Sequence, residues 1–209
     1  YYPLLLDLTE ADLLVVGAGA VGRRKIASLL RAAPRSVTVL DPFLDHGAAR
    51  ELEASGPVVC HARAFRPEDL PGKTLVFAAT GNPLVNDHIA ALCRGGGIPC
   101  NSVTAPEAGS FIVPAHFSSG DILVTVSTGG RSPALAKRLR EELEAWIGKR
   151  YTPLLSVLGR LRPLLLELRL PSEENSAVFR SIVFSALADL LERGDLAEAR
   201  TLLTRLLPN

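Results

Sequence analysis

The sequence predicts an α/β fold in which a parallel β-sheet domain is followed by a short intermediate segment and a small all-helical C-terminal domain. Short apolar runs recur through roughly the first 80 of the 209 residues, helix-like segments separate them, and only helical patterns follow residue 127. Alternation of strands and helices is typical of a parallel sheet. We therefore expect domain boundaries at 1–110, 111–148 and 149–209.

The first domain contains three runs that are apolar throughout, as in strands buried on both faces of a parallel sheet. These runs are residues 13–16, 37–40 and 74–79. Apolar residues recur at helical spacing over 20–33, just before a proline, and over 83–94, just before three glycines. Proline and glycine at these points are expected helix stops.

The middle segment holds one more expected strand, at residues 122–127. Ser132 and Pro133 then start a helix, because serine is a common N-cap and proline is tolerated at the first helical position. Apolar residues line one face of this helix, and Gly148 is its expected end.

Two further helices are expected in the C-terminal domain. Ser172 and the two glutamates that follow it open the first, whose apolar stripe runs to Leu190. Gly194 and Asp195 turn the chain, and the second helix covers 196–206. We expect the two helices to pack as a hairpin.

The segment Gly17-Ala-Gly19-Ala-Val-Gly22 lies between the first strand and the first helix, where a G-x-G-x-x-G motif binds a dinucleotide. The first glycine permits a tight turn, the second lets the backbone approach the pyrophosphate, and the third allows close packing of helix on strand. The N–H groups of Ala20 and Val21 are expected to face the phosphate at the positive end of the helix dipole. The sequence therefore predicts a Rossmann-type dinucleotide site.

Asp41, at the end of the next strand, is placed to accept hydrogen bonds from the adenosine ribose. Its charge would repel a 2′-phosphate, so we predict NAD rather than NADP, with Pro42 in the same site. The basic residues Arg23, Arg24 and Lys25 either reach a phosphate or form a solvated face of the helix, and both interpretations stay open.

Thr80 and Asn82 follow the third strand. Open parallel sheets bind ligands beyond the carboxyl ends of their strands, so these two residues are expected to line the same crevice. Either one is also suited to cap the helix that follows, and the two roles are compatible.

Composition argues against several other functions. The 23 basic and 22 acidic residues nearly cancel, so no broad cationic surface is available for nucleic acid. The cysteines, Cys60, Cys93 and Cys100, lack a C-x-x-C spacing and the four histidines form no ligand pattern, so we expect no metal site. No apolar stretch approaches the roughly 20 residues needed to span a bilayer. We expect a cytoplasmic protein.

Six short segments, in order along residues 1–145, carry a family signature. They are residues 2–7, 15–25, 78–80, 100–101, 110–114 and 126–133. The last, which contains Ser-Thr-Gly-Gly-Arg-Ser-Pro, is the most specific. Together they resemble the precorrin-2 dehydrogenase family, which includes the N-terminal module of siroheme synthase. The resemblance implies oxidation of precorrin-2 to sirohydrochlorin with NAD, in siroheme and related tetrapyrrole synthesis. It also implies Asn101 in the cofactor site and a homodimer with contacts through 111–148.

The main departure from this family is Thr104, where the family usually has an aspartate that is its proposed acid/base group. A carboxylate with a pKa of about 4 accepts a proton at neutral pH, whereas a threonine hydroxyl does not without a strong neighbouring base. Some members of the family also insert ferrous iron, and this loss should impair metal insertion more than hydride transfer. We therefore expect weak or no ferrochelatase activity. His116 is the candidate replacement base, or else an interface or surface histidine.

A tetrapyrrole ringed with carboxylates needs cations and N–H donors. Arg131 is suited to bind one carboxylate, and the helix start at Ser132 adds N–H groups beside it. The residues expected to bind the substrate are Ser110, Pro114, Thr128, Gly129, Gly130, Arg131 and Ser132.

Three alternatives stay open. A NAD-sensing regulatory module would bind the dinucleotide without chemistry, but such modules resemble only the first 100 residues. A bifunctional dehydrogenase and sirohydrochlorin ferrochelatase would retain both activities. A dehydrogenase for another small substrate is less favoured, because no Lys-His or Ser-Tyr-Lys set is evident.

Overall fold

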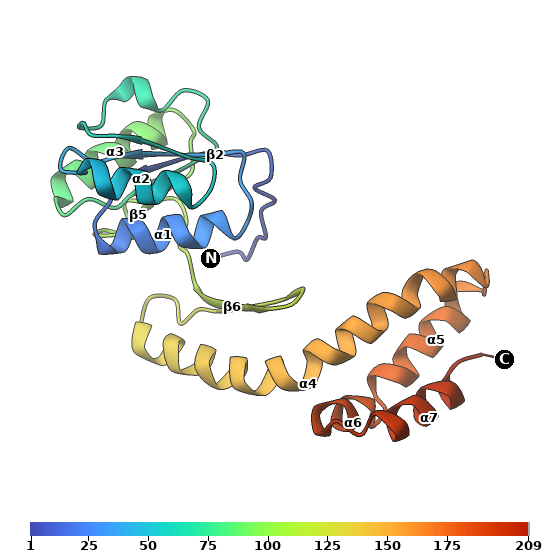
Figure 1. Ribbon diagram of the computed structural model, residues 1–209. Helices are drawn as coiled ribbons and strands as arrows, with labels where there is room; N and C mark the ends of the chain where they lie inside the picture. The colour runs from blue at the N-terminus through green and yellow to red at the C-terminus, as the bar shows by residue number, and fades with distance from the viewer. Residues whose placement is uncertain (209) are drawn as a thin grey trace. The chain divides into compact units, whose positions relative to one another are not determined.

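The computed structural model describes residues 1–208, and the chain divides after Val113 into two compact units (Figure 1). The first unit is an α/β sheet domain and the second is a β-hairpin followed by helices. The predicted fold, a parallel sheet followed by a helical C-terminal part, is confirmed. The finer division at residues 110 and 148 stays a prediction.

The first unit contains one five-stranded parallel sheet with the strand order β3-β2-β1-β4-β5. The strands are β1 (Asp12–Val16), β2 (Ser36–Leu40), β3 (Val58–His61), β4 (Leu75–Ala78) and β5 (Cys100–Ser102). Val15 of β1 pairs with Val39 of β2 and with Phe77 of β4. The strand order reverses between β1 and β4, so the carboxyl ends of these two strands flank the crevice in which such sheets bind ligands.

Helices cover both faces of this sheet. Helices α1 (Ala20–Leu30) and α2 (His46–Ala54) pack on one face, while α3 (Pro83–Gly95) covers the other (Figure 1). Leu70, which follows the 3₁₀ turn η1 (Pro67–Asp69), also packs on this second face. Side chains alternate across a strand, so β1 contributes Val15 to the first core and Leu14 to the second. Burial on both faces is why the strands are apolar throughout.

Asp12 joins the amino ends of three strands. Its carboxylate accepts hydrogen bonds from Nε of Arg35 (3.1 Å) and from the hydroxyl of Ser36 (2.6 Å). Its backbone N–H donates to Oγ1 of Thr74 (3.2 Å), just before β4. The hydrogen bonds from Arg35 and then Ser36 lower the pKa of Asp12 to about 2.

The second unit begins with an antiparallel hairpin of β6 (Ala115–Ser119) and β7 (Ile122–Val126). The long helix α4 (Pro133–Glu167) follows, and then come α5 (Ser172–Val183), α6 (Leu187–Arg193) and α7 (Leu196–Leu206). Leu154 of α4 and Ile182 of α5 lie at the centre of the core that the four helices share. Within the described chain, none of the helices combines the length and the apolar character that a membrane crossing requires.

The predicted helix end at Gly148 is wrong, because α4 continues through this residue to Glu167. A Cβ on Gly148 would lie 3.4 Å from Oγ of Ser119 in the hairpin. Ser119 in turn hydrogen-bonds the hydroxyl of Thr152, one turn further along α4 (2.7 Å). Gly148 therefore lies where the hairpin packs against the helix.

Two other predicted helices are too long. The first ends at Leu30 rather than Ala33, which adopts a left-handed φ of 48°. The helix expected over 172–190 is interrupted after Val183, and a new helix begins at Leu187. The hydroxyl of Ser185 accepts a hydrogen bond from the backbone N–H of Leu187 (3.1 Å) and thereby marks the break. Serine offers the backbone such local alternatives to a continuous helix.

The three cysteines are free thiols that form no disulfide. Cys93 of α3 and Cys100 of β5 are both buried in the core that α3 covers, whereas Cys60 is half-buried. The hydrogen bond with Cys93, together with burial, raises the pKa of the Cys100 thiol. These two thiols are therefore packing groups in the reduced state.

Candidate functional site

The glycine-rich loop runs from the end of β1 into α1, and two of its glycines are required by the fold itself. Gly17 has a φ of +103°, and a Cβ there would lie 2.4 Å from the carbonyl oxygen of Ala79. A Cβ on Gly22 would lie 1.9 Å from the carbonyl oxygen of Gly17. The loop is thus packed against the end of β4 and against the first turn of α1, with no room for side chains.

Gly19 differs, because a Cβ there would meet no atom within 4 Å. It is the N-cap of α1 and offers no side chain to the first turn, which contains no acidic residue. The first N–H groups of a helix have no intrahelical acceptor, so those of Ala20 and Val21 are available to a ligand. Open space above Gly19 and uncapped donors at the positive end of a helix are what a pyrophosphate requires.

Asp41 supports this loop from β2. Its Oδ2 accepts a hydrogen bond from the backbone N–H of Ala18 (2.7 Å), and its Oδ1 accepts one from the N–H of Phe43 (2.8 Å). Nε of Arg23 donates to the carbonyl of Ala18 from the other side (3.1 Å), and its guanidinium also reaches Glu51 (3.4 Å). Arg23 is therefore committed to the loop, which neither of the two open interpretations of this residue anticipated.

Phe43 was missed by the sequence analysis. It follows Asp41 and Pro42, and the residue is 92% exposed. An exposed aromatic ring beside the carboxylate that is predicted to bind the ribose is a suitable surface for stacking a base. An aromatic residue two positions after the acidic residue at a strand end was the signal available in the sequence.

The carboxyl ends of β4 and β5 are linked by Asn86 of α3, a fully buried side chain. Its Oδ1 accepts from the backbone N–H (3.1 Å) and the hydroxyl (2.7 Å) of Thr80. Its Nδ2 donates to the carbonyl of Thr80 (3.1 Å) and to Oγ1 of Thr104 (3.1 Å). Two of the predicted site residues are thus brought together by one that was not predicted.

A signal for Asn86 did exist in the sequence. It lies on the same helical face as Ile89, Ala90 and Cys93, which are all buried, so it is a polar residue in an apolar stripe. Asn82 caps the same helix by accepting a hydrogen bond from the N–H of Leu84 (3.0 Å), which confirms the capping alternative for this residue.

The other predicted residues of the first unit lie along β5. Nδ2 of Asn101, which is buried, donates to the carbonyl of Phe111 (3.0 Å). Ser110 exchanges hydrogen bonds with Cys100, since its Oγ accepts from the N–H of Cys100 and its own N–H donates to the carbonyl of that residue. These contacts hold residues 110–111 against the edge strand.

In the second unit, the predicted substrate-binding turn is a closed loop before α4. The hydroxyl of Thr128 accepts from the N–H of Ser132 and donates to its carbonyl (both 3.1 Å), and Oγ of Ser132 caps Leu135 (3.2 Å). Gly129 and Gly130 between them have positive φ angles of 62° and 83°. The turn is thus fixed by side chains that the sequence itself supplies.

Arg131 projects from this turn as an exposed residue. Lys137 and Arg138 on α4 are paired with Glu141 and Glu142, whereas Arg131 has no place among the ion pairs found in residues 1–208. Its guanidinium is therefore suited to bind an external carboxylate.

His116 lies on β6 and is half-buried. Its Nδ1 is 3.0 Å from the carbonyl oxygen of Pro114, and because a carbonyl only accepts, Nδ1 is the donor. This contact fixes the orientation of the ring and the tautomer in which Nδ1 carries a proton.

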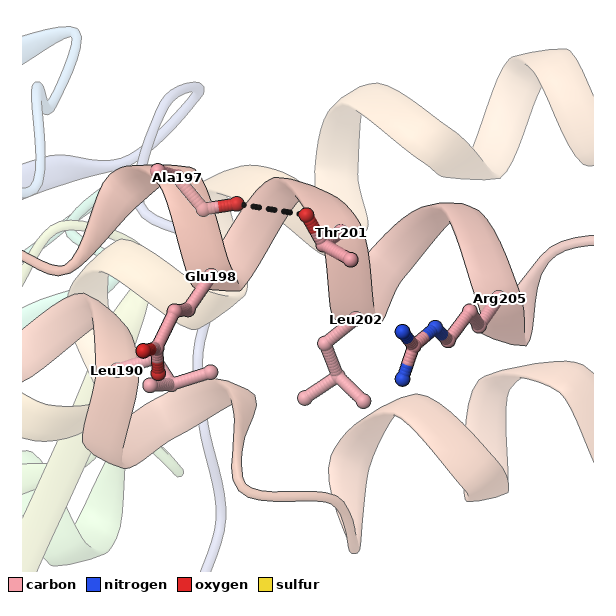
Figure 2. Close-up of a pocket in the computed structure, with 6 residues that line it drawn as sticks. All are labelled: Leu190, Ala197, Glu198, Thr201, Leu202 and Arg205. Atoms are coloured by element: carbon pink, nitrogen blue, oxygen red, sulfur yellow. Dashed lines mark hydrogen bonds between the residues drawn. The ribbon is translucent and has the colours of Figure 1, made fainter.

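The helical part of the second unit contains a shallow hollow of about 420 Å³. Figure 2 shows its lining, which comes from α6 and α7 and includes Glu198, Thr201 and Arg205. The hydroxyl of Thr201 is already bonded to the carbonyl of Ala197 within the helix (3.0 Å), and none of the predicted site residues lies there. Among residues 1–208, no group of three or more acidic, histidine or cysteine side chains could hold a metal ion.

The fold and the glycine loop define a Rossmann-type dinucleotide-binding protein. Residues 4–115 match the family described as "Putative NAD(P)-binding", and residues 120–145 match the family described as "Sirohaem biosynthesis protein central". The chain belongs to the first of these families.

Known proteins resemble the chain across both units. The siroheme synthase of Nitrosomonas europaea is 35% identical over 210 residues, which cover 100% of this chain and 44% of that protein. The siroheme synthase of Thioalkalivibrio sulfidiphilus is 38% identical over 174 residues, or 83% of this chain and 35% of that protein. The chain thus spans less than half the length of these relatives. A solved structure of "SirC, precorrin-2 dehydrogenase" matches with a TM-score of 0.79 and 26% identity, covering 99% of this chain and 98% of that one.

Proposed function

We propose that this protein is a precorrin-2 dehydrogenase, which oxidises precorrin-2 to sirohydrochlorin with NAD. The observation that carries the proposal is the match to a precorrin-2 dehydrogenase over almost the full length of both chains. A protein that only senses NAD would need the first unit alone, whereas this similarity extends through the hairpin and the helices.

The residues of the first unit fit the dinucleotide. The uncapped N–H groups of Ala20 and Val21 would hold the pyrophosphate over the open space at Gly19. Asp41 would accept hydrogen bonds from the adenosine ribose beside Pro42. Its negative charge favours NAD over NADP, since a 2′-phosphate would approach a carboxylate.

The remaining cofactor residues lie on the nicotinamide side of the crevice. Thr80, Asn82 and Asn101 follow or belong to β4 and β5, which lie across the reversal of strand order from Asp41. Bound NAD supplies the hydride acceptor, and oxidation removes one hydride and one proton from the substrate. The protein's part is to hold substrate and ring in register and to exclude water.

We propose that the second unit binds the carboxylates of the tetrapyrrole. Arg131 supplies an exposed guanidinium, and it is carried by the hydrogen-bonded turn of Thr128, Gly129, Gly130 and Ser132 before α4. Ser110 and Pro114 complete the predicted set. Truncation in Arg131→Ala should raise the KM for precorrin-2 about tenfold while it leaves the Kd for NADH unchanged.

Thr104 and His116 are the candidates for proton transfer. Among residues 1–208, the hydroxyl of Thr104 hydrogen-bonds only the neutral amide of Asn86, so no strong base activates it. His116 is therefore the better candidate, and His116→Ala should remove one limb of the dehydrogenase pH-rate profile. An unchanged profile would exclude His116 as the base.

A single anaerobic experiment tests the central proposal. Purified protein is supplied with precorrin-2 and either NAD or NADP, and the NADH absorbance band and the sirohydrochlorin spectrum are followed. We expect turnover with NAD and much slower turnover with NADP. Binding of NADH without turnover would identify a sensing module instead.

The same product is then offered ferrous iron. Because Thr104 cannot act as an anionic proton acceptor, we expect iron insertion no faster than the uncatalysed reaction. Efficient insertion would favour the bifunctional alternative, a dehydrogenase that is also a ferrochelatase.

We also propose that the protein is a cytoplasmic homodimer with contacts through residues 111–148. Exposed apolar side chains in this segment, Leu123, Leu135 and Trp146, support the proposal. Light scattering after size-exclusion chromatography should give twice the chain mass of 22.3 kDa.

A further inference from the structure

Asn86 fixes which of its neighbours donate hydrogen bonds and which accept them. The backbone N–H of Thr80 can only donate, so the atom it meets is the amide oxygen of Asn86 (3.1 Å). The backbone carbonyl of Thr80 can only accept, so the atom facing it is the amide nitrogen (3.1 Å). The orientation of the amide is thus set by two main-chain groups.

This orientation determines the state of the Thr104 hydroxyl. The second hydrogen on Nδ2 of Asn86 points to Oγ1 of Thr104 (3.1 Å), so Thr104 accepts from Asn86. Its own hydroxyl hydrogen is then left to donate to another group, and Thr104 is exposed.

The hydroxyl of Thr80 has the opposite role to that of Thr104, because its hydrogen is donated within the protein. This hydroxyl has one hydrogen and faces two groups that only accept, Oδ1 of Asn86 (2.7 Å) and the carbonyl of Asn82 (3.0 Å). Its oxygen already accepts from the backbone N–H of Asn82 (3.2 Å), so one lone pair is left. The hydrogen of Thr80 therefore points inward, and what its oxygen can offer to a ligand is a lone pair.

We propose that Asn86 is a positioning residue that prepares Thr104 as a donor and Thr80 as an acceptor for a primary carboxamide, the one carried by the nicotinamide ring. A carboxamide presents one carbonyl and one NH₂ group, which are the complements of this pair. The inference rests on the proposed function, because it assumes that the ligand is NAD. It is consistent with the place of both threonines at the ends of β4 and β5, on the nicotinamide side of the crevice.

Asn86→Asp reverses the polarity of this network with little change in shape. A carboxylate still accepts from the N–H and hydroxyl of Thr80, but it can no longer donate to the carbonyl of Thr80 or to the hydroxyl of Thr104. The hydroxyl of Thr104 then donates to the carboxylate and is lost to the ligand. We expect Asn86→Asp to weaken NADH binding about 3- to 10-fold, as for the loss of one hydrogen bond.

ADP-ribose separates this effect from damage to the fold, because it contains the adenosine, pyrophosphate and both riboses but no nicotinamide. Fluorescence titration with NADH and calorimetry with ADP-ribose should show Asn86→Asp and Thr104→Val binding ADP-ribose as the wild type does and NADH 3- to 10-fold more weakly. Thr104→Ser, which keeps the hydroxyl, should restore NADH binding. Thr9 lies just before β1, and its hydroxyl donates to Asp7 (2.8 Å). Thr9→Val is the matched control and should change neither Kd.

The double variant Asn86→Asp/Thr104→Val distinguishes positioning from separate effects. If Asn86 acts through Thr104, the double variant binds NADH no more weakly than Asn86→Asp alone. If the losses of NADH affinity in the two single variants multiply in the double variant, Asn86 does not act through Thr104. Wild-type NADH affinity in Thr104→Val would overturn the proposal even if Asn86→Asp fails to fold. If the wild-type protein binds ADP-ribose as tightly as NADH, the proposed contact with the carboxamide is excluded, but the proposed dinucleotide site is not. If the wild-type protein binds neither ligand, the proposed function itself is contradicted.

Discussion

The carboxylate of Asp41 accepts a hydrogen bond of 2.7 Å from the backbone N–H of Ala18, so the end of β2 directly supports the glycine-rich loop after β1. One side chain thereby links the groups proposed for the ribose and for the pyrophosphate. A change at Asp41 should affect both the shape of the loop and the choice of cofactor.

Asp41→Asn and Asp41→Ala separate these two roles. The single oxygen of asparagine can still accept from Ala18, but its NH₂ group can no longer accept from Phe43. The side chain carries no charge, so NADPH should bind nearly as well as NADH. Alanine also removes the hydrogen bonds to the loop, and NADH binding should weaken about 10-fold or more. Titration of both variants with NADH and NADPH checks this, with Asp121→Ala in the β6–β7 turn as a control that should keep wild-type affinities. Unchanged discrimination in Asp41→Asn would contradict the assigned role of the charge.

Gly17→Ala and Gly19→Ala should have opposite consequences. At Gly17 the φ of +103° and the contact with Ala79 make any side chain costly, so the free energy of unfolding should fall by about 3 kcal/mol. At Gly19 there is space for a methyl group and φ is −68°, so stability should fall by less than about 1 kcal/mol. Binding of NADH should nevertheless weaken at least about 10-fold in Gly19→Ala, because the methyl group occupies the expected pyrophosphate position. Urea unfolding and NADH titration measure the two effects, and normal binding by Gly19→Ala would argue against the predicted position.

Asp12 should make the stability of the first unit depend on pH in the acid range. Its pKa of about 2 in the folded protein lies below the value of about 3.9 for an unfolded chain. The folded state therefore favours the ionised carboxylate, and this contribution is complete above pH ~4 and is lost as the pH falls through about 2. The stability difference between wild type and Asp12→Asn should shrink between pH 5 and pH 2. Arg35→Gln should reproduce the trend, since Arg35 is the main cause of the lowered pKa, and a difference that is constant with pH would contradict it.

Gly148→Ala tests the correction to the helix boundary. Inside a helix, alanine is more stable than glycine by about 0.5–1 kcal/mol, and the new Cβ would be 3.4 Å from Ser119. We expect a small gain in thermal stability for Gly148→Ala and a loss for Gly148→Leu, whose larger side chain would displace the hairpin. If Gly148→Ala is also destabilising, the methyl group clashes with Ser119, and the expected gain in stability is contradicted.

Local signals account for the parts of the fold that were predicted. The buried strands β1, β2 and β4 are apolar throughout, and the glycine motif stands at the strand-to-helix junction that gives it meaning. Ser132 and Pro133 begin α4 as expected because capping depends on a few adjacent residues. Most of the dinucleotide loop was readable for the same reason.

Tertiary contacts account for what was missed. The edge strand β5 has the sequence Cys-Asn-Ser, which has no strand pattern and is ordered by pairing with β4 and by Ser110. Gly148 gives the usual signal of a helix end, but its significance comes from the hairpin packed against it. The role of Asn86 depends on Thr80 and Thr104, which are brought to it only by the sheet.

The buried pair of thiols in α3 and β5 can report how often β5 separates from α3. A water-soluble thiol reagent should label the half-buried Cys60 first, because it can reach Cys93 and Cys100 only when the edge strand separates from the helix that covers it. The rate of that slow labelling would time the opening of the same edge that carries Thr104. A ligand bound at the ends of β4 and β5 would lower the rate at which Cys93 and Cys100 are labelled, without contacting either sulfur atom.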